Sequence, residues 1–130
     1  MVGPVWDGCI SAADFASREW LAERQFPLLA LSSQARGFFT DRAHPDLRTD
    51  DEIVRCWYAE DNFERKRRAA ELAQKMGCAE INISLAYVLA QPFPIWTLIG
   101  PATIREVRSC WRSLDVSISS NEVRWLNLEE

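Results

Sequence analysis

The sequence predicts a helix-rich α/β fold with about two parallel strands, formed by residues 1–130 as a single domain. Two short apolar runs, LLALS at Leu28–Ser32 and IWTLIG at Ile95–Gly100, lack polar alternation, which is typical of strands buried on both faces of a parallel sheet. Helical patterns lie before, between and after these runs, so helices are expected to connect the strands. A chain of 130 residues provides one modest domain rather than two.

Apolar residues at helical spacing predict several helices around the two strands. An imperfect apolar face on the first helix consists of Phe15, Trp20 and Leu21, and such a face on the helix after the second strand consists of Ile104, Val107 and Trp111. The segment 79–90 is apolar on most sides and is expected to be largely buried. The predicted helices cover residues 12–24, 50–58, 61–76, 79–90, 104–114 and 119–126.

Polar residues and glycine predict where several helices begin and end. Ser11 is the expected N-cap of the first helix. Asp61, with Glu64 three residues on, matches the capping-box pattern. Gly77 suits the C′ position after 61–76. Thr103 is expected to cap the helix that follows the second strand.

Composition and charge argue against several classes of partner. The formal net charge of −4 argues against a nucleic-acid binder. The densest basic run, 64–68, lies between acids in an Ala-rich pattern and is expected to be a solvated helix face. No apolar run approaches the roughly 20 residues that span a bilayer, and the first nine residues do not resemble a signal peptide. We therefore expect a cytoplasmic protein that binds neither nucleic acid nor membrane.

The cysteines and the histidine do not form a metal-binding pattern. Cys9, Cys56, Cys78 and Cys110 contain no C-x-x-C pair, and His44 is near none of them in the sequence. A disulfide framework is not expected in a chain without an export signal. We expect reduced thiols and no metal site.

Both predicted strands end in residues able to bind an anion. Ser32, Ser33, Gln34, Arg36 and Gly37 follow the first strand, and Gly100, Pro101, Ala102 and Thr103 follow the second. Ligands of parallel α/β proteins gather at the carboxyl ends of strands, and Thr103 lies at a predicted helix N-terminus that suits a phosphate. Phe38 and Phe39 are expected to anchor the first loop. Neither loop matches G-x-G-x-x-G or a P-loop, so two ordinary turns with a normal Thr cap remain the alternative.

Four segments, taken in their order, resemble a known family. They are FPLLALSSQARGFF, DNFERKRRAAELAQKMG, ISLAYVLAQPFPIWTLIGPATIREV and VRWLNLEE. Together they resemble the C-terminal part of bacterial aldo/keto reductases, from about Trp6 to the end of the chain, with SSQARGFF as the most specific element. That family has a (β/α)8-barrel fold and reduces carbonyls with NADP(H). The resemblance implies that Leu28–Ser32 is barrel strand seven and Ile95–Ile99 is strand eight.

The resemblance also implies which residues would contact NADP(H). The pyrophosphate and nicotinamide ribose would lie by Ser32, Ser33, Gln34, Ala35, Arg36 and Gly37, the 2′-phosphate by Gly100, Ala102, Thr103 and Glu106, and the adenine by Ser109 and Cys110. Leu31 stands where many members carry an aromatic residue that stacks on the nicotinamide. Ala102 lies near a position where many carry a cation for the 2′-phosphate, and Arg105 could substitute for it.

The family's catalytic Tyr, Lys, Asp and His come from earlier barrel strands. In this chain Tyr87 is expected to pack within a helix, and Tyr58 and His44 fall between the two strands. A full barrel needs eight strands and about 250 residues. We therefore expect the C-terminal cofactor-binding part of a reductase, inactive alone and beginning after strand six, with Trp6–Cys9 in the preceding loop.

Three interpretations of the chain remain open. In the first, the chain is part of an NADP(H)-dependent oxidoreductase. In the second, it is a non-catalytic module that docks onto a partner chain supplying the missing barrel strands. In the third, it is a decayed fragment. Two parallel strands cannot close a barrel, and the six tryptophans add apolar surface that favours association. The carbonyl substrate is not determined, because other elements of the barrel would shape its pocket.

Overall fold

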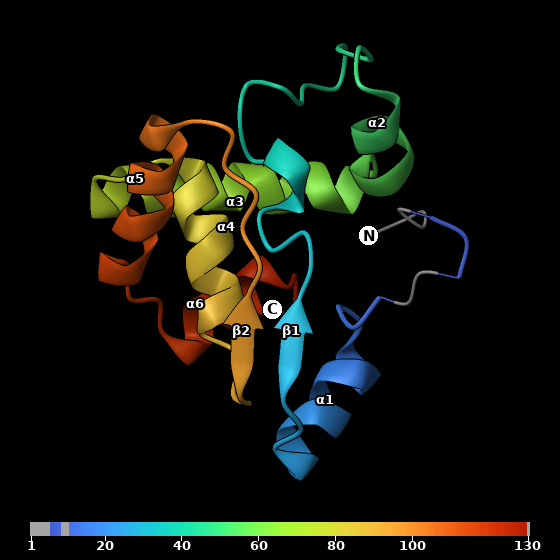
Figure 1. Cartoon of the computed structure of the whole chain (residues 1–130), viewed down its shortest axis with the longest axis vertical. Coiled ribbons are helices and arrows are strands. Elements are labelled where there is room, and N and C mark those ends of the chain that lie inside the picture. The colour runs from blue at the N-terminus through green and yellow to red at the C-terminus, as the bar shows by residue number, and fades with distance from the viewer. Residues whose placement is uncertain (1–5, 9–10, 130) are drawn as a thin grey trace.

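The computed structural model describes residues 6–8 and 11–129 and has the predicted helix-rich α/β character (Figure 1). The order of the described elements is α1 (Phe15–Arg24), β1 (Leu28–Ala30), the 3₁₀ turn η1 (Ala35–Gly37), α2 (Asp51–Trp57), α3 (Glu60–Met76), α4 (Glu80–Leu89), β2 (Ile95–Thr97), α5 (Ile104–Arg112), the 3₁₀ turn η2 (Ser113–Asp115) and α6 (Ser120–Leu126). Helices therefore fill the connection between the two strands.

The two strands pair in parallel, as the sequence predicts. Leu28 lies opposite Ile95, Leu29 opposite Trp96 and Ala30 opposite Thr97. Figure 1 shows both strands pointing the same way, so the loops that follow them leave from one end of the sheet. Both strands are shorter than predicted. β1 stops before Ser32, whose φ of 51° is left-handed and incompatible with a continuing strand.

One face of the sheet is open in the described chain. α4 packs against β2, and α3 packs against α4. Leu29 and Trp96, which are neighbours in register, are 63% and 57% exposed. The prediction of strands buried on both faces is wrong for this chain, because these two side chains have no element covering them.

The buried core consists of two clusters. The first surrounds Phe38, which is fully buried, and joins the loop after β1 to α2. The second joins α3, α4 and α6 around Leu72 and Ile83. Phe39 packs against both clusters and meets Phe38 edge to face, with ring centroids 5.4 Å apart. The prediction that these two phenylalanines anchor the loop is confirmed.

Two of the predicted helix boundary signals are confirmed and two are wrong. Thr103 caps α5, and Gly77 ends α3 in the left-handed conformation. α1 begins after Asp14 rather than Ser11, because the Asp14 carboxylate accepts from the backbone N–H of Ser17 at 2.9 Å. α3 begins after Ala59, so the capping box predicted from Asp61 does not form.

Two predicted apolar helix faces are only partly buried. Phe15 and Trp20 on α1 and Ile104 and Trp111 on α5 are exposed, whereas Leu21 is buried and Val107 half-buried, so each predicted face is only partly covered in the chain as described. Helical spacing places such residues on one side of a helix but does not provide an element to cover them. α4 is buried from Asn82 to Ala86, which agrees with its apolar composition.

The basic run 64–68 is only partly a solvated helix face. Arg67 is exposed and pairs with Glu64 at 2.8 Å, as expected of such a face. Arg65 and Arg68 instead donate to backbone carbonyls at the end of α6, and Lys66 donates to carbonyls in the loop after η1. These contacts join α3 to segments far away in the sequence.

Within the described residues, no helix is both long and apolar enough to cross a membrane. Across the same residues, no three or more His, Cys, Asp or Glu side chains gather to hold a metal ion. Cys56, Cys78 and Cys110 form no disulfide among the described residues. Cys9, the end of the predicted Trp6–Cys9 loop, lies outside the described residues.

Candidate functional site

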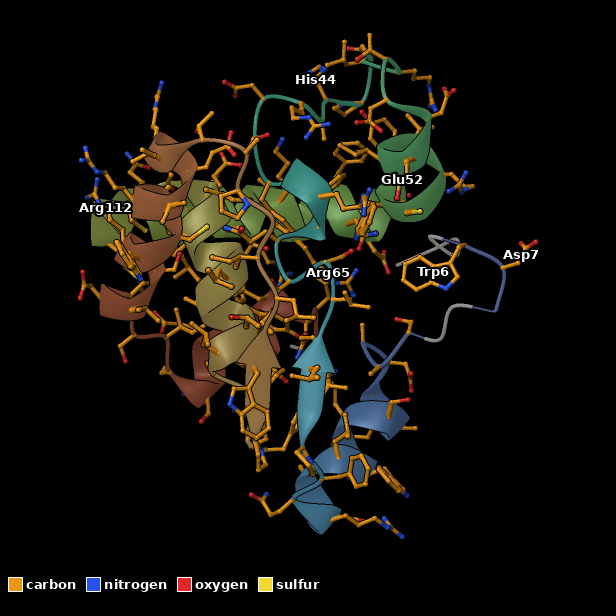
Figure 2. All side chains as sticks on the ribbon, in the orientation of Figure 1. Trp6, Asp7, His44, Glu52, Arg65 and Arg112 are labelled. Atoms are coloured by element: carbon orange, nitrogen blue, oxygen red, sulfur yellow. The ribbon has the colours of Figure 1, made fainter. Side chains whose placement is uncertain are left out.

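A groove of about 720 Å³ lies where the loops leave the carboxyl ends of β1 and β2, and we call it the end groove. Its size is within the range of small-molecule and cofactor sites. Figure 2 shows Trp6, from the N-terminal segment, on the same side of the molecule as Glu52 of α2. The lining of the end groove consists of Trp6, Leu31, Ser32, Ser33, Gln34, Arg36, Gly37, Thr40, Arg42, Asp50, Glu52, Ile81, Leu98, Ile99, Gly100, Pro101, Glu106, Ser109 and Cys110.

The end groove gathers nine of the twelve predicted site residues. They are Ser32, Ser33, Gln34, Arg36, Gly37, Gly100, Glu106, Ser109 and Cys110. Ala35 is absent from the lining because it is buried with Phe38 beneath the loop. Ala102 and Thr103 are exposed beside the groove without lining it.

The loop after β1 has an unusual backbone. Ser32, Ala35 and Arg36 have φ values of 51°, 47° and 51°, in the left-handed region that non-glycine residues rarely adopt. Gly37 follows at 89°, where the lack of a side chain avoids this strain. Strained residues of this kind concentrate at ligand sites.

The backbone amides of this loop are available to a ligand. Among described residues, the N–H groups of Ser33, Gln34 and Arg36 meet no hydrogen-bond acceptor, whereas those of Ala35 and Gly37 do. Successive amides in turn conformations form concave anion sites. The β1 side of the end groove can therefore bind an anion through backbone groups.

Side-chain hydrogen bonds tie the two walls of the groove together. The Ser33 hydroxyl donates to the carbonyl of Leu98 at 2.9 Å, and the Cys110 thiol donates to Gln34 Oε1 at 3.4 Å. The buried amide of Asn82 donates to both the carbonyl and the hydroxyl of Ser109, at 2.7 and 3.2 Å. These bonds position α5 against the first loop and leave the groove preformed.

Two ion pairs line the groove on the side of α2. Arg36 pairs with Glu52 at 2.9 Å, and Arg42 pairs with Asp50 at 2.6 Å. The backbone N–H of Ile53 and the guanidinium of Arg42 lower the pKa of Asp50, so its carboxylate is charged at neutral pH. The Arg36 and Arg42 side chains are 47% and 62% exposed, and exposed pairs contribute at most about 1 kcal/mol. A ligand phosphate can therefore compete for them.

A carboxylate lies on the other wall, at the N-terminus of α5. Thr103 Oγ1 accepts from the backbone N–H of Glu106 at 3.2 Å. The Oε2 atom of Glu106 in turn accepts from the backbone N–H of Ala102 at 2.6 Å. Arg105 is exposed and does not belong to the groove lining. The N-terminus of a helix attracts anions, and in α5 the carboxylate of Glu106 already occupies that position.

Sequence reasoning missed part of the lining, notably Arg42, Asp50 and Glu52. Arg42 lies in a polar stretch between the predicted elements, and Asp50 begins the predicted helix 50–58. Asp50 followed by two further acids carries the signal of a helix N-terminus, and it does accept from the Ile53 N–H at 3.0 Å. These residues lie beside the strand ends because of the fold of residues 38–50, and no local sequence pattern predicts that position.

The side chains that most resemble catalytic groups lie outside the groove lining. The Tyr58 hydroxyl lies within hydrogen-bond distance of the backbone carbonyls of Leu47 and His44 and accepts from the His44 N–H. The Tyr87 hydroxyl donates to Asn127, and burial raises its pKa. Each therefore has a structural partner, which for Tyr87 agrees with the predicted packing role.

One curated protein shares a detectable stretch of sequence with this chain. Over 58 residues the chain is 33% identical to a protein named "Uncharacterized oxidoreductase YrpG" from Bacillus subtilis (strain 168). The match covers 45% of this chain and 18% of that protein, so the chain spans only a small part of its relative. No family model and no solved structure matches the chain.

Proposed function

We propose that this chain is the cofactor-binding part of an oxidoreductase, specifically the C-terminal segment of a cytoplasmic aldo/keto reductase that uses NADP(H). In this proposal β1 and β2 are strands seven and eight of a (β/α)8 barrel. The observation that carries it is the end groove, which lies at the shared carboxyl ends of two parallel strands and is lined by amides and guanidiniums. The partial match to an oxidoreductase supports the same class.

The β1 side of the groove fits the pyrophosphate of a dinucleotide. The free N–H groups of Gln34 and Arg36 and the Arg36 and Arg42 guanidiniums all belong to one short segment. Charged donors and backbone amides together are the usual partners of phosphate oxygens. A bound nicotinamide cofactor would supply the hydride, and these residues would hold it in place.

The chain by itself is expected to bind cofactor without reducing a carbonyl. The described groove lining contains neither of the two tyrosines, neither of the two lysines and no histidine. No described group of that kind can therefore donate a proton there. Residues from the rest of the barrel would complete the active site. Turnover of an aldehyde by the purified 130-residue chain would contradict this part of the proposal.

Titration with NADPH tests the proposed site, with tryptophan emission as the signal because Trp6 lines the groove. Arg36→Ala is expected to weaken binding about tenfold or more, since a hydrogen bond to a charged group contributes about 1.5–3 kcal/mol. Arg112→Ala is the matched control. Arg112 lies at the far end of α5 (Figure 2), and the one hydrogen bond of its guanidinium within the described part of the chain goes to the Gly77 carbonyl, at 3.5 Å.

The outcomes of this titration separate binding from its absence. Saturable quenching that Arg36→Ala weakens and Arg112→Ala preserves would support the site. Unchanged emission of the wild-type chain at about 1 mM NADPH and also at about 1 mM NADH would argue against it.

A second candidate function is a non-catalytic assembly module that docks onto a partner chain carrying the missing strands. The exposed pair Leu29 and Trp96 favours it, because parallel sheets are normally covered on both faces. Co-purification with a chain that carries the other strands would support docking. A stable, monodisperse monomer without ligand would count against it.

A further inference from the structure

The charges of the end groove are unevenly distributed between its two walls. Two guanidiniums, Arg36 and Arg42, face three carboxylates, Asp50, Glu52 and Glu106, so the lining carries a net charge of −1 at neutral pH. On the α2 side each carboxylate is paired with a guanidinium. The unbalanced negative charge therefore lies on the α5 side.

Glu106 carries that unbalanced charge. It forms no ion pair with any described residue, and only its Oε2 atom has a partner, the N–H of Ala102 at 2.6 Å. Its Oε1 atom has no donor among the described residues, so it can accept from a ligand. Arg105, one residue earlier in α5, lies outside the lining and does not neutralise it there.

This wall suits a neutral group with hydroxyl donors and repels a second phosphate. A carboxylate that accepts from ribose hydroxyls is the usual device for selecting a dinucleotide without a 2′-phosphate, whereas an arginine accommodates the 2′-phosphate. A phosphate placed here would meet like charge and find the helix terminus already occupied.

We infer that the end groove binds NADH in preference to NADPH, with Glu106 as the residue that determines this preference. The inference rests on the proposed dinucleotide site and differs from it in one respect, the preference for NADP(H) that the family resemblance implies. Arg36, Arg42 and the loop amides bind the pyrophosphate common to both cofactors, while Glu106 accepts from the adenosine ribose and disfavours the 2′-phosphate.

Parallel titrations of the 130-residue chain with NADH and NADPH test this inference, by tryptophan emission and by calorimetry. We expect the wild-type chain to bind NADH about tenfold more tightly. Glu106→Gln keeps the size of the side chain and an oxygen for the Ala102 N–H but removes the charge. It should tighten NADPH binding about tenfold while changing NADH binding less than about threefold.

Glu122→Gln provides a matched control. Glu122 has a comparable role at the start of α6, where it accepts from the Ser119 N–H at 2.7 Å, but it does not line the groove. This substitution should leave both affinities unchanged. A general effect of losing a capping carboxylate would instead appear in both variants.

The possible results distinguish this inference from the proposed function. Equal or tighter binding of NADPH by the wild-type chain, or an equal effect of Glu106→Gln on both cofactors, would overturn the role of Glu106 and leave the dinucleotide site standing. Binding of neither cofactor at about 1 mM would overturn both. The relative affinity for NADH and NADPH is measured on the wild-type chain, so the predicted cofactor preference is tested even if Glu106→Gln disturbs folding.

Discussion

Lys66 is the residue that holds the loop after η1 against α3. Its ammonium donates to the carbonyl oxygens of Thr40 and Ala43, at 2.7 and 2.5 Å. Burial lowers its pKa, while the nearby carboxylates of Glu80 and Asp41 act in the opposite direction. Because Thr40 lines the end groove, this contact links the helical core to the candidate site.

Replacing this ammonium should destabilise the protein. Lys66→Met keeps the aliphatic stem but leaves two carbonyls without their donor, at an expected cost of about 1–3 kcal/mol in the free energy of unfolding. Lys75→Met is the control, since Lys75 makes an exposed pair with Glu71 and should change stability by less than about 1 kcal/mol. Urea unfolding measures both, and equal losses would contradict the role of Lys66.

At the scale of elements, α3 contains a carboxylate held in its charged form by two arginines. Hydrogen bonds from Arg67, and to a smaller extent from Arg68, lower the pKa of Glu64 to about 2, from an ordinary value of 4.5. The pKa is lower in the folded state than in the unfolded state. The stabilising contribution is therefore complete above pH 4.5 and is lost as the pH falls toward 2.

This linkage predicts a pH-dependent effect of one substitution on α3. The wild-type chain should be more stable than Glu64→Gln at neutral pH, and the difference should shrink below pH 4.5 and vanish near pH 2. Unfolding followed by circular dichroism across this range measures it. A difference that stays constant with pH would show that the charge of Glu64 is not responsible.

For the whole molecule, the open face of the sheet determines solution behaviour. Leu29 and Trp96 are adjacent and exposed, and a two-stranded sheet is rarely stable without further cover. We expect the chain to self-associate increasingly with concentration, and Leu29→Lys combined with Trp96→Lys to reduce this. Light scattering coupled to size-exclusion chromatography measures the mass.

A control for this association comes from α5. Ile104 is 73% exposed and belongs to α5 rather than to either strand, so Ile104→Lys removes one apolar side chain without changing the sheet residues. It should leave self-association nearly unchanged. Equal effects of this variant and the double variant would indicate general hydrophobicity as the cause.

The sequence by itself determined the order of the elements and several of their ends. Thr103 and Gly77 act through atoms a few residues away, so their roles follow from local chemistry. The two apolar runs predicted the parallel strands, and polar groups directly after them line the end groove as expected. Glu106, Ser109 and Cys110, which also line it, followed only from the family resemblance. Their contact with a cofactor stays a prediction.

Only the tertiary structure decided which surfaces are covered and which charges meet. The exposure of Leu29 and Trp96 depends on what packs over the sheet, which no periodicity records. The hydrogen bonds from Lys66 to the loop after η1 and from Cys110 to Gln34 join residues more than 20 positions apart. Sequence patterns report neighbours along the chain, whereas these features depend on neighbours in space.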